Sequence, residues 1–365
     1  MCYNNMDRKI SDRINIYKLY LAIMVVYIHS NNGIDLASGK VIGESNVWLD
    51  IFKNIISDGI ARCAVPAFFL ISAYLLYSKP LDYKHNLKKK VRRLVVPYFI
   101  LNTFWIAFYA FFQMIPSLSD FFANPDKIVA NWDFGDWVNV YLGVTDYPIC
   151  AQLWFVRDLF VLNVLAYAIK LLIDKFPKLI MVVLLLLLLS GVKSPIFCLA
   201  TNALCFWSFG CYLAKYKVSL NCVDGIKWRY ITPIYVILLV LREVLRGRID
   251  GCVTSVVYSG VIIVGVIFWF KYTAIHRGAK CNRFLKNMSK YSFDIYIFHE
   301  LNMTIVKKIC GKLLPKTVFS QLVQYIGIPI LIIGCCIVLC VLMERFAPRM
   351  YAILTNKVAF KDKRI

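Results

Sequence analysis

Apolar residues occur in this chain as long runs rather than as short amphipathic stripes. A helix needs about 20 mostly apolar residues to cross a bilayer, and ten runs of roughly that size follow one another. They occupy residues 14–32, 49–77, 94–116, 152–173, 178–192, 196–214, 229–246, 253–272, 291–311 and 321–345. The run at 178–192 is short, and charged and amide side chains interrupt the run at 291–311. The pattern predicts an all-α, polytopic membrane protein with about ten transmembrane helices.

The composition agrees with a membrane protein. Of the 365 residues, 60% are hydrophobic and 18% are charged, whereas ordinary globular domains are about 45–50% apolar. No internal repeat and no low-complexity linker divides the chain. We therefore expect a single transmembrane domain over residues 1–345, followed by a short basic cytoplasmic tail over residues 346–365.

The chain carries a formal net charge of +22, from 43 Lys and Arg against 21 Asp and Glu. Such a surplus in a soluble protein would suggest nucleic acid as a partner. With the N-terminus placed in the cytoplasm, however, 28 basic residues fall in cytoplasmic segments and only 7 in outer ones. Cytoplasmic loops of membrane proteins show this excess. We therefore expect both termini inside, a multi-pass protein of the inner (cytoplasmic) membrane, and no nucleic-acid partner.

The 13 cysteines lie mostly inside apolar runs and form no CxxC pair. Disulfide frameworks and zinc sites need Cys or His brought together at regular spacings. The sequence therefore predicts neither, and we expect no metal.

Titratable residues inside the spans are the first candidates for function, because an isolated charge at the bilayer centre costs at least about 2.5–3.5 kcal/mol. His29 stands in a first span that has little other strong polarity, and Lys18 precedes it by eleven residues. Eleven residues are close to three helical turns, so the two side chains would share one face about 16 Å apart. This face suits a long substrate with an anionic end. The alternative is a core histidine bonded to a neighbouring helix and an interfacial lysine.

Two arginines precede the third span. Arg92 and Arg93 close a basic loop just before the apolar run, and guanidinium pairs beside the start of a helix bind phosphate well. A plain cytoplasmic stop signal would have the same composition.

Further charges lie within later spans. Arg62 stands four residues before Pro66. A proline bends a helix and frees the carbonyl four residues back. The arginine would therefore line an opening at the bend, or it would simply pack within a kinked helix. Arg157 follows Trp154, which could be an interfacial anchor. His299 adjoins Glu300 in the ninth span. Arg242 and Glu243 lie near a predicted outer end, where long side chains reach the interface.

Five segments in register resemble the integral membrane acyltransferase 3 family over essentially the whole chain. They are Lys18 to His29; Arg62, Val65, Pro66, Phe68, Phe69, Ser72 and Tyr74; Arg92, Arg93, Pro97 and Tyr98; Leu153, Trp154 and Phe155; and Ile295, Tyr296, Phe298 and His299.

The resemblance implies a ten-span enzyme that moves an acyl group, usually acetyl, from cytoplasmic acyl-CoA to a hydroxyl of an envelope sugar. It implies that His29 is the essential histidine, that Lys18 is its basic companion, and that Arg92 and Arg93 belong to the donor site. The family commonly has arginine where Lys18 stands and glycine where Ala73 stands. A lysine lacks the planar two-pronged contact of arginine, which puts strict phosphate binding at Lys18 in doubt.

The residues and the resemblance together give one hypothesis. The phosphates of acyl-CoA bind Arg92, Arg93 and Lys18, and His29 acts as general base on the acceptor hydroxyl or accepts the acyl group itself. Arg62, Arg157 or His299 would stabilise the oxyanion, and the activated thioester requires no metal. The acceptor would be a glycan or a lipid-linked sugar.

Two other functions use the same residues. A transporter or exporter of a glycan or small anion would use the buried charges as a pathway, although the halves of the chain show no repeat. A non-catalytic partner in envelope assembly would tolerate substitution of both His29 and Arg92.

Overall fold

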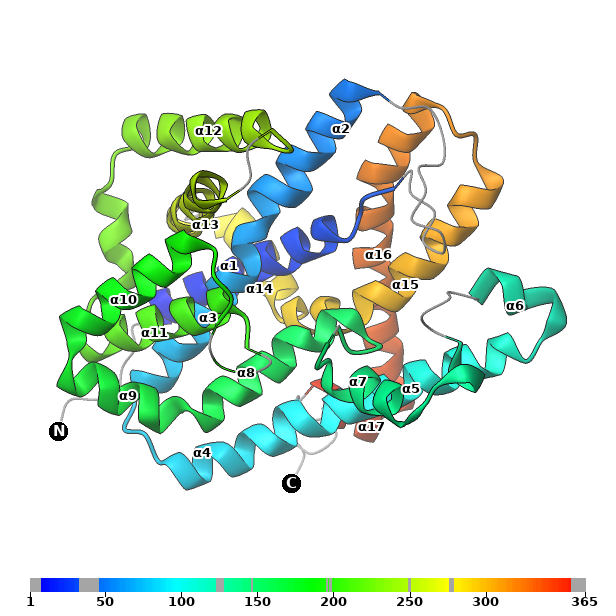
Figure 1. The fold of residues 1–365 in the computed structure, drawn as a ribbon, viewed down its shortest axis with the longest axis horizontal. Helices are drawn as coiled ribbons and strands as arrows, with labels where there is room; N and C mark the ends of the chain where they lie inside the picture. Colours follow the sequence, from blue (N-terminus) through cyan, green and yellow to red (C-terminus); the bar gives the residue numbers. More distant parts are fainter. Residues whose placement is uncertain are drawn as a thin grey trace. The chain divides into compact units, whose positions relative to one another are not determined.

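The computed structural model describes residues 8–32, 46–122, 128–145, 147–194, 196, 199–248, 251–275 and 279–355. Every regular element in these ranges is a helix, and no strand occurs in them (Figure 1). The predicted all-α class is confirmed. The chain forms two compact units: unit 1 comprises residues 1–29, 50–84 and 162–296, and unit 2 comprises residues 30–49, 85–161 and 297–365.

Unit 1 is built from the first helix and the central part of the chain. Its elements are α1 (Arg8–Ile28), the π-helical turn η1 (Asn54–Ile60), the 3₁₀ turn η2 (Ala61–Cys63), α3 (Ala64–Tyr77), α9 (Ala166–Lys175), α10 (Pro177–Ser190), α11 (Thr201–Lys215), η7 (Leu220–Gly225), α12 (Trp228–Leu245), α13 (Cys252–Tyr272) and α14 (Ala279–Ser289).

Two close contacts organise unit 1. Helix α11 approaches α3 so closely that a Cβ on Gly210 would lie 2.2 Å from the Leu70 carbonyl oxygen, which is how small residues let helix backbones meet in membranes. At the other contact, the guanidinium of Arg13 on α1 donates to Asp224 at 2.8 and 2.9 Å and to the Phe270 carbonyl at 2.9 Å. Arg13 is 8% exposed, so this ion pair ties α1 to η7 and α13.

Unit 2 holds most of the remaining elements. They are the π-helical turn η3 (Val91–Val95), α5 (Val96–Gln113), α6 (Pro116–Phe122), η5 (Val129–Asn131), α7 (Phe134–Leu142), η6 (Ala151–Leu153), α16 (Val318–Phe346) and α17 (Pro348–Thr355). Four helices contain residues of both units: α2 (Val47–Lys53), α4 (Tyr83–Lys90), α8 (Trp154–Val164) and α15 (Ser292–Leu313).

Each predicted apolar run contains helix, although the runs 14–32 and 196–214 extend beyond α1 and α11. In the described part of the chain, four helical stretches are long and apolar enough to cross a membrane, namely Val47–Tyr77, Tyr83–Gln113, Cys252–Tyr272 and Val318–Phe346. The apolar helix Pro177–Ser190 is shorter. The predicted span 152–173 is divided at Leu165 into α8 and α9. A multi-pass arrangement is supported, while the count of ten remains a prediction.

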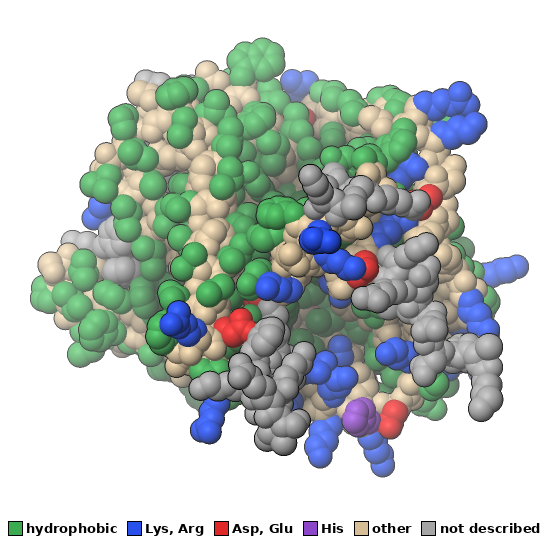
Figure 2. All heavy atoms as spheres, turned by 180° about the vertical axis from the view of Figure 1, so that it is seen from behind, with side chains coloured by type: hydrophobic (Ala, Val, Ile, Leu, Met, Phe, Trp, Pro, Cys, Tyr) green, Lys and Arg blue, Asp and Glu red, His purple; other side chains and the backbone are tan. Residues whose placement is uncertain are grey.

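Large hydrophobic side chains are exposed on both units. They include Leu179, Leu186, Ile237 and Val253 in unit 1 and Phe104, Phe111, Ile330 and Val338 in unit 2. Hydrophobic side chains also cover much of the face seen in Figure 2. Water-facing surfaces rarely expose large contiguous apolar patches, whereas helices that cross a bilayer are predominantly apolar.

Candidate active site

His29 lies in a turn at the end of α1 in unit 1. The helix ends at Ile28, four residues before the predicted run does, because Ser30, Asn31 and Asn32 follow and such side chains compete with helical backbone bonds. The backbone N–H of His29 donates to the Val26 carbonyl at 3.2 Å. The Tyr27 carbonyl, one of the last of the helix, accepts from the Ser57 hydroxyl at 2.6 Å. His29 is thus half-buried at a capped helix end.

Lys18 occupies the same helix, eleven residues before His29, and is also half-buried. Because α1 is regular up to Ile28, the axial separation from Lys18 remains about 16 Å. The orientation of His29 is set by the turn rather than by helical phase. The shared helix face predicted from the spacing therefore applies only up to Ile28.

Arg62 lies in η2, between the π-helical η1 and the start of α3. The helix is thus irregular just before Pro66, at the position where the sequence predicts a distortion. The guanidinium of Arg62 donates to the Asp58 carboxylate at 2.5 and 3.1 Å, and Asp58 also binds Arg246. Arg62 belongs to an ion-pair cluster of unit 1.

Arg92 and Arg93 lie in the π-helical turn η3 of unit 2, and both are exposed. The sequence places them beside the start of a helix, but α4, η3 and α5 form one continuous helix from Tyr83 to Gln113 (Figure 1). The backbone N–H of Val96 donates to the Val91 carbonyl, so no free helix N-terminus supports the pair. That part of the prediction is wrong: binding of phosphate here would depend on the side chains. π-Helical turns are rare and often occur at functional sites.

Arg157 on α8 is held by groups of unit 2. Its guanidinium donates to the Asp158 carboxylate at 2.9 and 3.0 Å and to the carbonyls of Leu142 and Gly143 at 2.9 and 2.6 Å. Asp158 is completely buried. The two carbonyls belong to the C-terminal end of α7, where a cation is favourable. These contacts fix the guanidinium in place.

His299 on α15 is completely buried. Gln152 binds the helix on either side of it: its backbone N–H donates to Glu300 Oε2 at 2.9 Å, and its side-chain amide donates to the Ile297 carbonyl at 3.2 Å. The backbone N–H of Cys150, two residues before Gln152, donates to Asn102 Oδ1 on α5 at 3.1 Å. A chain of buried amides thus joins α5 to the part of α15 that carries His299.

Sequence reasoning missed Asn102 and Gln152 as parts of this region, whereas Asp158 was noted beside Arg157 as a charge within a predicted span. Asn102 and Asp158 are fully buried, and Gln152 is 3% exposed. The available signal was an amide or a carboxylate within an apolar run, since a buried polar group requires a partner there.

The candidate residues divide between the units. Lys18, His29 and Arg62 belong to unit 1, and Arg92, Arg93, Arg157 and His299 belong to unit 2. Within unit 2, the segment from Cys150 to Asp158 connects Arg157 with the neighbourhood of His299. Among the residues that the structure describes, no group of three or more His, Cys, Asp or Glu side chains is placed to hold a metal ion.

Comparison with known proteins gives a match over nearly the whole chain. A family model described as "Acyltransferase domain" matches residues 12–345. The succinoglycan biosynthesis protein ExoH of Rhizobium meliloti (strain 1021) is 28% identical over 235 residues, which are 63% of this chain and 60% of that protein. The chain therefore matches less than two thirds of this relative's length. No solved structure matches.

Proposed function

Because this chain belongs to the acyltransferase family whose model covers residues 12–345, we propose that it is a membrane-embedded O-acyltransferase. It transfers an acyl group, in the first instance acetyl, from cytoplasmic acyl-CoA to a hydroxyl of a cell-envelope polysaccharide. The family match carries this proposal, and a half-buried histidine at the end of an otherwise apolar helix supports it.

His29 is assigned the role of general base. It takes the proton of the acceptor hydroxyl as the hydroxyl oxygen attacks the thioester carbonyl carbon. The C–O bond forms, the C–S bond breaks, and the proton passes to the departing CoA thiolate. In the covalent variant, His29 accepts the acyl group first and the hydroxyl then removes it. In both variants, an imidazole is required because it gains and loses a proton near neutral pH.

The donor site is assigned to the basic stretch around η3. Arg92 and Arg93 are exposed beside the exposed Lys88 and Lys89, and the two guanidinium groups suit the phosphates of CoA. Lys18 is assigned as a further cation toward the donor. Its ammonium acts as a point charge without the two-pronged geometry of arginine.

Among the candidates for stabilising the oxyanion, we favour His299. A donor acts most strongly where water is excluded, and His299 is fully buried while Arg62 has 40% and Arg157 18% of its side chain exposed. The ion pairs of Arg62 with Asp58 and of Arg157 with Asp158 also occupy part of each guanidinium. These arginines are assigned to hold the local structure.

The acceptor is assigned as a polysaccharide from the relative's name, which places that protein in succinoglycan biosynthesis. A multi-pass chain can present acyl-CoA from the cytoplasm and meet a glycan at the outer surface. Lipid-linked sugars are included in this class.

The test is His29→Ala in native membranes, with acyl transfer to the purified polysaccharide and consumption of acetyl-CoA as readouts. Loss of a general base lowers the rate by about 100-fold or more. His85→Ala, on the exposed surface of α4, is the matched control and should retain the wild-type rate. Folded His29→Ala protein with near wild-type transfer would refute the role of His29, and a wild-type protein that leaves acetyl-CoA untouched would favour the transporter.

A further inference from the structure

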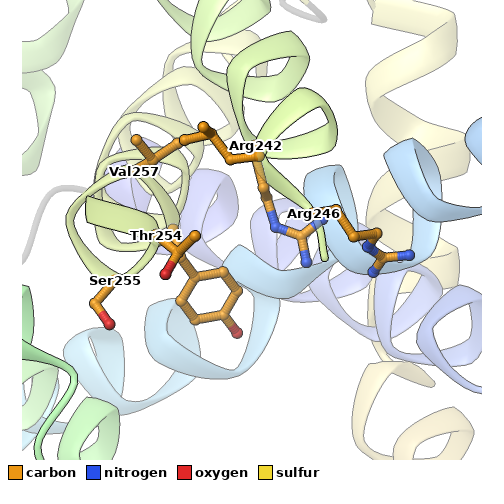
Figure 3. Close-up of a pocket in the computed structure, with 7 residues that line it drawn as sticks. Arg242, Arg246, Thr254, Ser255 and Val257 are labelled. Atoms are coloured by element: carbon orange, nitrogen blue, oxygen red, sulfur yellow. The ribbon is translucent and has the colours of Figure 1, made fainter. Parts of the chain in front are cut away.

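A pocket of about 280 Å³ lies in unit 1 between α12 and α13. Arg242, Leu245 and Arg246 line it from α12 and its end, and Thr254, Ser255, Val257 and Tyr258 line it from α13 (Figure 3). Ligand pockets usually measure about 300–1,000 Å³, and this pocket lies just below that range, so it would hold at most one sugar-sized group.

One charge in this pocket lacks a carboxylate partner among the described residues. Arg246 binds Asp58 at 2.5 Å and lies 3.9 Å from Glu243. Asp58 also binds Arg62, and Glu243 accepts from Asn54 at 3.1 Å. Among the described residues, three arginines (Arg62, Arg242 and Arg246) therefore lie near only two carboxylates (Asp58 and Glu243).

The unmatched cation is Arg242. Its guanidinium carbon lies 5.4 Å from the centre of the Tyr258 ring, and it makes no hydrogen bond or salt bridge with any described residue. The side chain is half-buried. A partly desolvated guanidinium is stabilised by an anion that fills its fork.

The opposite wall of the pocket also favours negative charge. Thr254 and Ser255 lie in the first turn of the 21-residue helix α13, where the backbone amides carry partial positive charge. The Thr254 hydroxyl donates to the Gly251 carbonyl at 2.8 Å, so its oxygen lone pairs remain available to a donor group of a ligand. The Ser255 hydroxyl lies against Gly191 and points away from Arg242 in Figure 3. A ligand with both an anionic group and hydroxyls fits such walls.

We propose that this pocket binds the carboxylate or phosphate group of an anionic sugar. The sequence places the end of α12 at the outer surface, which is the side from which the acceptor arrives. Identification of the sugar as part of the acceptor rests on the proposed acyltransferase function, whereas anion binding itself does not. The acceptor would thus be an acidic rather than a neutral glycan.

The test measures binding to the purified full-length protein in neutral detergent without any acyl donor. The probes are glucuronate for the carboxylate, inorganic phosphate for the phosphate, and glucose as the uncharged control, with the thermal unfolding midpoint and calorimetric titration as readouts. At least one anion should bind while glucose does not. Arg242→Gln should weaken that binding by about tenfold or more, whereas Arg248→Gln, an exposed arginine in the same connection, should leave it unchanged.

Arg242→Lys keeps the charge but loses the fork and should give intermediate binding, so it replaces Arg242→Gln if that variant does not fold. The proposal is overturned if neither anion binds, if glucose binds as well as the anion that binds, or if both Arg242 variants bind like the wild type. Because no acyl donor is present, these outcomes are independent of whether His29→Ala abolishes acyl transfer.

Discussion

At the scale of single residues, Asp174 shows how a local ion pair joins two helices. Its carboxylate at the end of α9 lies 2.6 Å from Lys170 Nζ and 2.8 Å from Lys215 Nζ on α11. The Lys170 and Lys215 ammonium groups hold the pKa of the Asp174 carboxyl below its ordinary value. Asp174 follows the predicted span 152–173, whose end we expect to face the cytoplasm.

Asp174→Asn should therefore lower stability at neutral pH but not in acid. A carboxyl with a lowered folded pKa stabilises the native state above its unfolded pKa of about 4, and this contribution is lost as pH falls through the folded value. Each partly exposed pair is worth about 0.2–1 kcal/mol. Unfolding midpoints of the two proteins should differ at pH 7 and converge once the pH falls below the lowered pKa of the Asp174 carboxyl. Lys215→Gln should cause little further loss of stability in the Asp174→Asn protein. Fully additive losses from the two substitutions would show that the Asp174–Lys215 pair contributes nothing to stability.

Residue chemistry predicted which side chains would be unusual but not what they would bind. Arg62 and Arg157 were singled out as charges within spans, yet each has an aspartate partner four residues or one residue away. The contacts of Gln152 depend on which helices meet. Tertiary packing determines which helices meet, and the periodicity of apolar residues along the chain does not reveal it.

At the scale of helices, the contact between α3 and α11 leaves no room for a side chain at Gly210. A Cβ there would lie 2.2 Å from the Leu70 carbonyl oxygen and 3.0 Å from Ala73 Cβ. The nearest atom belongs to the backbone, so relief requires the two helices to separate.

Gly210→Ala should consequently destabilise the protein by about 1–3 kcal/mol, as overpacking does. Gly334→Ala on α16 is the matched control, because a Cβ there meets nothing within 4 Å and alanine favours a helix by up to about 1 kcal/mol. Thermal unfolding in detergent distinguishes them: the first midpoint should fall and the second should not. Equal midpoints for Gly210→Ala and the wild type would show that α3 and α11 pack less closely.

Helix positions followed from the apolar runs, while helix irregularities did not. The run 253–272 corresponds to α13 over Cys252–Tyr272, because a spanning helix is marked by composition alone. The π-helical turns at Asn54–Ile60 and Val91–Val95 leave no comparable mark, since the same residues form ordinary helix equally well. The prediction of a helix start beside Arg92 failed because the basic residues before it already form helix from Tyr83 onward.

At the scale of the molecule, the count of spans depends on helices that length and hydropathy alone do not identify. Helix α10 has 14 residues and a length of about 21 Å, less than the roughly 30 Å hydrocarbon core. Helix α15 has 22 residues but carries Asp294, Glu300 and several lysines. Local thinning of the bilayer or partners within the protein would let such helices cross.

Reporter fusions test the ten-span arrangement. Fluorescent-protein fusions after Lys178, Lys217 and Arg345 should fluoresce, because excess basic residues keep those segments in the cytoplasm. Alkaline phosphatase fusions after Lys193 and Lys316 should be active, because these positions are predicted outside. An active phosphatase after Arg345 would give an odd number of spans and overturn the placement of the C-terminus.

The π-helical turn at Arg92 and Arg93 also has an evolutionary consequence. A π turn pairs each N–H with the carbonyl five residues back instead of four, so it accommodates one residue more than the α-helix on either side. Loss of one residue between Val91 and Val95 would restore an unbroken α-helix, and if the lost residue were Arg92 or Arg93 it would replace the paired guanidinium groups by a single one. Length variation among descendants of this gene should therefore concentrate at this turn, and where it removes an arginine it would change the charge at the proposed donor site.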